Sequence, residues 1–164
     1  MHGYTAPEHL IVTHNILTGN DDYGIIFGGA NDVAAHNILY KNYNGGVFFF
    51  RDGCKKGVVV NKIFVEPGDA GAIGYDHNPS GNLVDYVCLS PETKLCEPVA
   101  GNTHGEHSVK ADPMLVDAEQ LDFHLKKGSP CMGAGDKHSG TYWGNAPDMG
   151  WYQSGSGEVK GKQF

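Results

Sequence analysis

The sequence predicts an all-β fold, a right-handed single-stranded parallel β-helix of three to four coils with an irregular C-terminal cap. The first observation is an internal repeat: His14-Asn15-Ile16-Leu17 recurs as His36-Asn37-Ile38-Leu39, and Asn61-Lys62-Ile63-Phe64 continues the series. A period of about 20 to 25 residues, rich in Ile, Val, Phe, Asn and Gly, is typical of coils that stack on one another. Each coil would rise by about 4.8 Å over the previous one.

The second observation is strand-like spacing inside each repeat. Matched apolar positions lie two residues apart, as Ile25 and Phe27 do, which indicates strands with alternate side chains inward and disfavours a helical solenoid. Ile26 and Phe48 lie between such positions and are expected to face outward. The expected core columns are Val12, Ala34 and Val59; Ile16, Ile38, Ile63 and Leu83; Ile25, Val47 and Ile73; and Phe27, Phe49 and Tyr75.

The third observation is the turn chemistry between the strands. Gly-Asn, Asn-Gly and Asp-Gly pairs supply the positive φ that tight turns require. Asn15 and Asn37 are expected to stack as a ladder of side-chain hydrogen bonds. His14 stacks above His36, but the column ends in Asn61 and offers no third ligand, so it does not predict a zinc site.

Composition suits a turn-rich all-β chain and disfavours some classes of function. The 164 residues include 24 Gly, and 19% of the residues are charged, as expected for one domain or a short capped solenoid. The net charge is −7 and Arg51 is the only Arg, so the clustered cations that bind nucleic-acid phosphates are lacking. Without an apolar run of about 18 residues or a signal-like segment, the sequence predicts neither a membrane span nor an export signal.

Four cysteines leave the redox state open. They are Cys54, Cys88, Cys96 and Cys131, and none lies in C-x-x-C spacing, so a zinc knuckle or redox motif is not predicted. A disulfide between Cys88 and Cys96 would close a short loop. Four buried thiols are the alternative, because free cysteine is among the most buried residue types.

The organisation changes toward the C-terminus. Residues 1–89 hold the coils, residues 90–110 are expected to form an irregular connection, and residues 111–164 a C-terminal coil and cap within the same structural domain. Phe123 and Leu125 alternate as in a strand. A cap is expected because the last coil of a solenoid otherwise exposes its apolar interior and its unpaired strand edges.

Five short segments of this C-terminal region form a specific set. They are Asp112-Pro113-Met114-Leu115-Val116-Asp117, Leu121-Asp122-Phe123-His124-Leu125, Gly128-Ser129-Pro130-Cys131, Gly133-Ala134-Gly135-Asp136 and Ala146-Pro147-Asp148-Met149-Gly150. Together they resemble the closing segment of secreted, pectate-lyase-like right-handed β-helix proteins. The chain departs from that pattern at Cys131, where the family has Ala, at Gly133, where Asp is common, and at Trp151, where a small residue is usual.

The resemblance implies a role involving a glycan. Proteins of this kind are often polysaccharide lyases, glycoside hydrolases, uronan epimerases or carbohydrate-binding modules, and they are extracellular or periplasmic. A lyase acting on an acidic sugar needs a cation, often calcium, to neutralise the carboxylate and a base to remove the C5 proton. Calcium is therefore the cofactor to expect if the chain is a lyase.

Charged residues follow two equivalent strands. Arg51-Asp52 ends one strand, and Asp76-His77 ends the equivalent strand one coil later. Arg51 could neutralise a sugar carboxylate, and His77 beside a carboxylate could act as a base near neutral pH. These four residues are the candidate catalytic groups, and each has an alternative as an ordinary turn residue.

Three further residues are candidates for contact with substrate. Asp21-Asp22 resembles the adjacent aspartates of polygalacturonases, although the His and Arg-x-Lys of those enzymes are missing, and the pair also suits a turn. Outward-facing Phe48 could stack on a sugar ring or contact another subunit.

Two hypotheses follow. The first is a non-catalytic or vestigial carbohydrate-associated module that binds an acidic polysaccharide, self-associates, or does both. The alternative is a glycan-active lyase, hydrolase or epimerase. The short stack favours the module, because catalytic β-helices usually stack about ten coils. Residues 1–7 are too few to cover the first coil, so a homo-oligomer is expected, most simply an end-to-end dimer.

Overall fold

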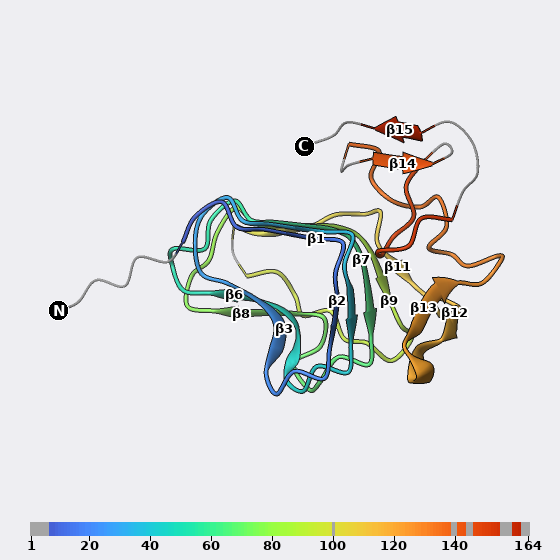
Figure 1. Cartoon of the computed structure of the whole chain (residues 1–164). Helices are drawn as coiled ribbons and strands as arrows, with labels where there is room; N and C mark the ends of the chain where they lie inside the picture. The colour runs from blue at the N-terminus through green and yellow to red at the C-terminus, as the bar shows by residue number, and fades with distance from the viewer. Residues whose placement is uncertain (1–6, 100, 139–140, 144–145, 155–158, 162–164) are drawn as a thin grey trace.

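The protein is a parallel β-solenoid of about four turns, which confirms the predicted all-β class (Figure 1). The computed structural model describes residues 7–99, 101–138, 141–143, 146–154 and 159–161. Seen along the solenoid, successive turns overlie one another, and the C-terminal segments lie to one side of them. No helix in the described part of the chain is long and apolar enough to cross a membrane.

Each turn repeats the same strand positions. The first turn holds β1 (Ile11–Thr13), β2 (Ile16–Thr18) and β3 (Tyr23–Phe27), and the second holds β4 (Val33–Ala35), β5 (Ile38–Tyr40) and β6 (Gly45–Phe50). The third holds β7 (Val58–Val65) and β8 (Ile73–Asp76), and the fourth begins with β9 (Leu83–Leu89). Two short strands, β10 (Thr103–His104) and β11 (Val109–Lys110), add to β9.

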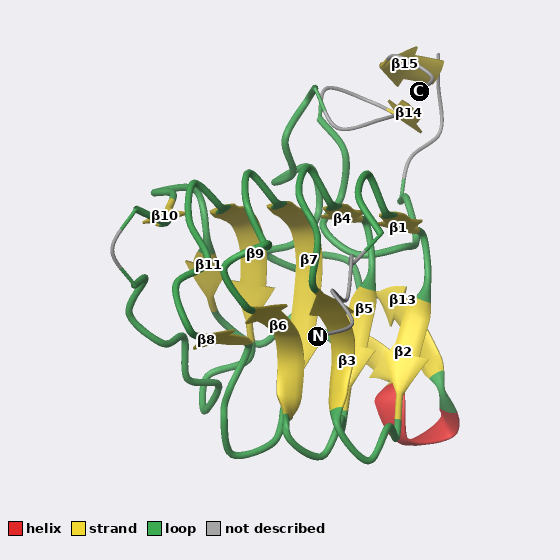
Figure 2. Cartoon of the chain, turned by 90° about the vertical axis from the view of Figure 1, so that its left-hand side faces the viewer, coloured by secondary structure: helices red, strands yellow, loops and turns green. Residues whose placement is uncertain are grey.

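The strands form two main parallel sheets. β7 continues through the positions of both β4 and β5, so β1, β2, β4, β5, β7 and β9 to β11 make one eight-stranded sheet. β3, β6 and β8 make the other, a three-stranded sheet. Figure 2 shows strands of successive turns lying side by side. The space between the sheets, which we call the lumen, is filled by apolar side chains.

Three of the four predicted core columns are confirmed by strand register. The column of Val12, Ala34 and Val59, the column of Ile25, Val47 and Ile73, and the column of Phe27, Phe49 and Tyr75 all pair as expected. Their members fill the lumen or pack against the residues that do. Burial of these aligned apolar surfaces is the main force holding the turns together.

The remaining column was wrong in its fourth member and in its direction. Ile63 pairs with Cys88, whereas Leu83 pairs with Val58 one strand position earlier. Ile38 and Ile63 are fully buried, but in a cluster separate from the lumen. In β7 a corner residue with positive φ, Asn61, lies between Val59 and Ile63. It interrupts the alternation of the strand, so that the side chain after it points inward and Ile63 points outward. Leu17, Leu39, Phe64 and Leu89 are the lumen residues at this position.

The predicted asparagine ladder is confirmed. The Asn15 backbone N–H and side-chain amide both donate to Asn37 Oδ1, at 2.9 and 3.1 Å, and Asn37 Nδ2 donates to the Val12 carbonyl at 2.8 Å. His14 stacks on His36 with ring centroids 4.8 Å apart. Asn61 then lies within hydrogen-bonding distance of His36, so this column links corners of the coil.

The C-terminal region contains β12 (Leu115–Asp117), the 3-10 helix η1 (Ala118–Gln120), β13 (Asp122–Leu125), β14 (Thr141–Trp143) and β15 (Val159–Gly161). Its residues between Leu115 and Tyr152, which we call the cap, cover the outer face of β2, β5, β7 and β9. Phe123, Cys131 and Met149 pack against Ile38 and Ile63 in the cluster outside the lumen. The sequence predicted that this segment would cover the last coil; its buried contacts are instead with the side of the stack.

The cysteines are four free thiols, so the Cys88–Cys96 disulfide is not formed. Cys88 belongs to the cluster under the cap, whereas Cys96 packs against the lumen cluster.

Candidate functional site

The outer face of the β3–β6–β8 sheet carries a strip of aromatic rings. We call Tyr23, Phe48 and Phe50 the aromatic strip. The Tyr23 and Phe48 rings stack with centroids 4.4 Å apart, and Phe48 stacks on Phe50 at 5.9 Å. The strip thus runs along β6, from Tyr23 beside Gly45 to Phe50, and lies beside Ile26, which is 45% exposed.

Glycines in the strands allow these rings to lie on the sheet. A Cβ at Gly74 would stand 2.8 Å from Phe48 Cδ2 and 2.9 Å from the Tyr23 hydroxyl. A Cβ at Gly45 would stand 2.8 Å from Tyr23 Cε1. Glycine inside a strand often marks such a close approach. The rings are therefore positioned by two residues that contribute no side chain.

Arg51 and His77 flank the Phe50 end of the strip. The Arg51 guanidinium lies over the Phe50 ring, 4.4 Å from its centroid, and the His77 ring meets the same ring edge-on at 6.2 Å. Both residues follow their strands in positive-φ conformations and lie on adjacent turns, where the Arg51 N–H donates to the Asp76 carbonyl at 3.3 Å. A cation over an aromatic face is an attractive arrangement, which orients the guanidinium.

The carboxylates at this end have local partners. Asp76 Oδ2 lies 2.7 Å from His77 Nδ1, and Asp76 Oδ1 accepts the His77 N–H at 2.9 Å. Asp52 Oδ1 accepts the Asn78 N–H at 3.1 Å. An imidazole held by a carboxylate at Nδ1 has its other nitrogen free for proton transfer, but both side chains are well exposed, at 58% and 42%.

Asp21 and Asp22 lie at the opposite end of the sheet. They precede β3, whereas Arg51 follows β6, so a strand length of about 15 Å separates the two groups. Asp22 Oδ1 accepts a hydrogen bond from Asn44 Nδ2 at 2.7 Å, in the turn of the next coil. The Tyr23 hydroxyl has a raised pKa, because of its partial burial and then of the nearby Asp22 carboxylate. The structure brings Arg51, Asp52, Asp76 and His77 together, and leaves both aspartates apart from them.

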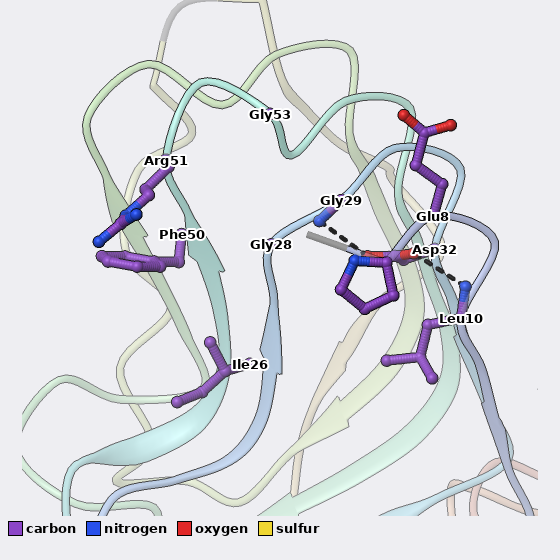
Figure 3. Close-up of a pocket in the computed structure, with 10 residues that line it drawn as sticks. Glu8, Leu10, Ile26, Gly28, Gly29, Asp32, Phe50, Arg51 and Gly53 are labelled. Atoms are coloured by element: carbon purple, nitrogen blue, oxygen red, sulfur yellow. Dashed lines mark hydrogen bonds between the residues drawn. The ribbon is translucent and has the colours of Figure 1, made fainter. Parts of the chain in front are cut away.

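A pocket of about 620 Å³ adjoins the Arg51 end (Figure 3). Ile26, Phe50 and Arg51 line one side, and Leu10 lies on the other. Asp32 also lines it, but its carboxylate accepts the Leu10 N–H at 2.9 Å and the Gly29 N–H at 3.3 Å. Asp32 therefore anchors the surrounding backbone.

One polar cluster was not predicted from the sequence. Asp85 Oδ2 lies 2.8 Å from His107 Nδ1, Asp85 Oδ1 accepts the N–H groups of Tyr86 and His107, and the Tyr86 and His107 rings stack at 4.4 Å. Its members lie on successive turns, but His107 belongs to the irregular connection, so the sequence repeat does not place it. The sequence analysis also did not predict Tyr23 and Phe50 as site residues. Gly45 and Gly74, which lie under the rings, could have indicated that aromatic side chains pack on this face of the sheet.

The described residues contain no group of three or more His, Cys, Asp or Glu side chains placed to hold a metal ion. Comparison with protein-family models, curated proteins and solved structures gives no match.

Proposed function

We propose that the chain is a non-catalytic carbohydrate-binding module of the pectate-lyase-like kind, which packs its aromatic strip against the sugar rings of an acidic polysaccharide. The observation that carries the proposal is the ordered row of Tyr23, Phe48 and Phe50 on an outer face. The rings stack on one another and Arg51 covers Phe50, so the ring edges and the exposed Ile26 form the apolar surface that the C–H face of a pyranose ring can cover, and such a clustered surface marks an interaction site. The resemblance of the C-terminal segments to secreted β-helix proteins also implies an extracellular or periplasmic location.

Arg51 supplies the preference for an acidic sugar. Its guanidinium is already held over Phe50, so a uronate ring stacked beside Phe50 can present its carboxylate to the planar fork of the arginine. Because the chain carries a net charge of −7, long-range electrostatics oppose a polyanion, and stacking must supply most of the affinity. Binding should therefore persist when ionic strength is raised above the physiological value.

The test is affinity gel electrophoresis in polygalacturonate and in alginate. Phe48→Ala should weaken the affinity measured from the retardation about tenfold or more, because it removes the central ring of the strip. Arg51→Lys should weaken binding to the acidic glycans and leave binding to a neutral glycan unchanged. Trp151→Ala is the matched control, since it removes an exposed aromatic ring from the cap. Equal effects of Phe48→Ala and Trp151→Ala would contradict the proposal.

The second candidate function is a lyase, favoured by the orientation of His77 through Asp76 close to Arg51. In that case His77 Nε2 would remove the C5 proton, and Arg51 or an added calcium ion would neutralise the uronate. Incubation with the same polymers, with and without calcium, should then produce the ultraviolet absorbance of an unsaturated product. His77→Ala should abolish it.

We also propose self-association through the first turn. Within the described residues, β1, β2 and β3 are hydrogen-bonded to a neighbouring strand on one side only, and Ile11 of β1 is 64% exposed. Unpaired strand edges next to apolar side chains favour pairing with another chain, and a two-fold axis would cover both copies.

Light scattering should give about twice the chain mass of 17.6 kDa. Leu10→Lys should shift it toward the monomer; a wild-type monomer at high concentration would contradict the proposal.

A further inference from the structure

The cap and the solenoid meet at two cysteines. Cys88 lies in β9, and Cys131 lies in the cap after β13; both are 0% exposed and belong to the same apolar cluster. Cys88 Sγ donates to the Ala111 carbonyl at 3.6 Å, and Cys88 is also the first cause of the raised pKa of the Cys131 thiol, so the two side chains lie close together in this cluster. Cys54 and Cys96 instead contact the cluster in the lumen.

Ordered backbone holds each of these cysteines. Cys88 is paired on one side with Ile63 of β7 and on the other with Val109 of β11. The Cys131 N–H donates to Ser129 Oγ at 3.1 Å, and its carbonyl accepts the Met149 N–H at 2.9 Å. The fold therefore holds both side chains in one buried cluster, where a disulfide between them would fasten the cap to β9.

We propose that Cys88 and Cys131 form a disulfide that fastens the cap to the solenoid when the chain folds under oxidising conditions. Glutathione disulfide is a suitable oxidant. One cysteine thiolate attacks it and releases a first glutathione, and the second cysteine thiolate attacks the mixed disulfide and releases a second one. The cysteines lose two protons and two electrons in total, and the electrons reduce the glutathione disulfide to two thiols.

The bond forms as the cap docks on the solenoid, when the two cysteines have met but are still accessible. In the folded protein the interaction with the Cys88 side chain, and then burial, raise the pKa of the Cys131 thiol, so the reactive thiolate is scarce. Neither sulfur is then accessible to an oxidant. Closing the long loop between the two residues restricts the unfolded chain and so stabilises the fold.

The test is refolding of the reduced, denatured chain in a buffer of glutathione and glutathione disulfide. Free thiols are then alkylated under denaturing conditions and the peptides are mapped without reduction. We expect one Cys88–Cys131 link, with Cys54 and Cys96 alkylated. Adding a reductant should lower the thermal midpoint of this product by about 5 to 10 °C.

Two variants sharpen the result. Cys96→Ala should keep both the link and the sensitivity to reductant, because Cys96 lies in the other cluster. Cys131→Ala should lose both. A link from Cys88 to Cys96, four alkylated cysteines in the refolded wild type, or a midpoint that ignores the reductant would each overturn the proposal.

Discussion

Two outer faces of the solenoid differ in what covers them. On the β3–β6–β8 sheet, Ile26 points outward and is 45% exposed, next to the aromatic strip. On the face formed by β2, β5, β7 and β9, Ile38 points outward as well, yet it is fully buried under the cap. Outward direction from the lumen therefore does not imply exposure, and the C-terminal segment decides which face is available to a ligand.

Polar contacts at the rim also hold the cap on its face. Glu119 of η1 accepts a hydrogen bond from the Tyr40 hydroxyl at 3.0 Å, and the same oxygen lies 2.5 Å from Lys41 Nζ. Tyr40 also meets Phe123 edge-on at 5.4 Å. In the described residues of the aromatic strip, by contrast, the ring contacts are within the sheet and its turns. The cap therefore buries the face of β2, β5, β7 and β9, whereas the face of β3, β6 and β8 stays accessible to a ligand at Ile26.

A charge placed on each face should have very different effects on stability. Ile38→Asp puts an unpaired carboxylate beneath the cap and should cost about 4 kcal/mol or more, a large part of a total stability of about 5 to 15 kcal/mol. Ile26→Asp should cost less than about 0.5 kcal/mol, as exposed substitutions usually do. Urea denaturation followed by circular dichroism measures both. Similar losses would show that the two faces are equally covered.

Two glycines of the cap test how closely it packs. Gly150 has φ +86°, and a Cβ there would stand 2.7 Å from Ile63 Cδ1, so Gly150→Ala should cost about 2 to 3 kcal/mol. Gly133 has φ +61°, and a Cβ there would meet nothing within 4 Å, so Gly133→Ala should cost only the backbone strain of about 1 kcal/mol. Equal unfolding free energies for the two variants would mean that the cap is loosely packed.

A buried amine in the lumen, that of Lys62, should have a smaller effect on the free energy of unfolding, and this effect should depend on pH. Lys62 is 0% exposed, its Nζ has no hydrogen-bond partner in the described structure, and burial lowers its pKa well below 10.5. Between that lowered pKa and 10.5 the unfolded chain binds the extra proton, so stability rises with pH. Lys62→Met should therefore stabilise the fold by about 1 to 3 kcal/mol, more at acid than at alkaline pH.

Thermal melts of wild type and Lys62→Met at several pH values check this sign. The gap between the two midpoints should narrow as pH rises toward 10.5, because the unfolded amine then loses its proton as well. A gap that widens with pH, or a destabilised Lys62→Met, would mean that the amine is charged and paired in the folded protein.

The repeat predicted most of the fold, because aligned apolar residues must stack if each coil is to bury its interior. It failed at the coil corner, where residues such as His36 adopt a positive φ of 52° and reverse the face on which the next side chains lie. Nothing local in Ile38 distinguishes an inward from an outward isoleucine. The last full turn is also longer than the sequence alignment assumed, so Ile63 pairs with Cys88 and not with Leu83.

The candidate site was predictable in part. Turn residues that follow equivalent strands must lie on adjacent coils, so Arg51 and His77 could be placed together from the register alone. The separation of Asp21 and Asp22 also follows from strand length, once the strand between the two ends is recognised. The Asp85–His107 contact could not be foreseen, because the connection between these residues is irregular and its length does not reveal its path.

A backbone-amide NMR titration with a uronic acid oligosaccharide shows directly whether the aromatic strip is the surface that binds a glycan. If the strip binds the glycan, chemical shifts should change at Tyr23, Phe48, Phe50 and His77, and they should stay constant at Ile38 under the cap. The Phe48→Ala variant should lose these changes while keeping a folded spectrum. Shift changes confined to the cap, or none at saturating oligosaccharide, would contradict the assignment of the open face as the binding surface.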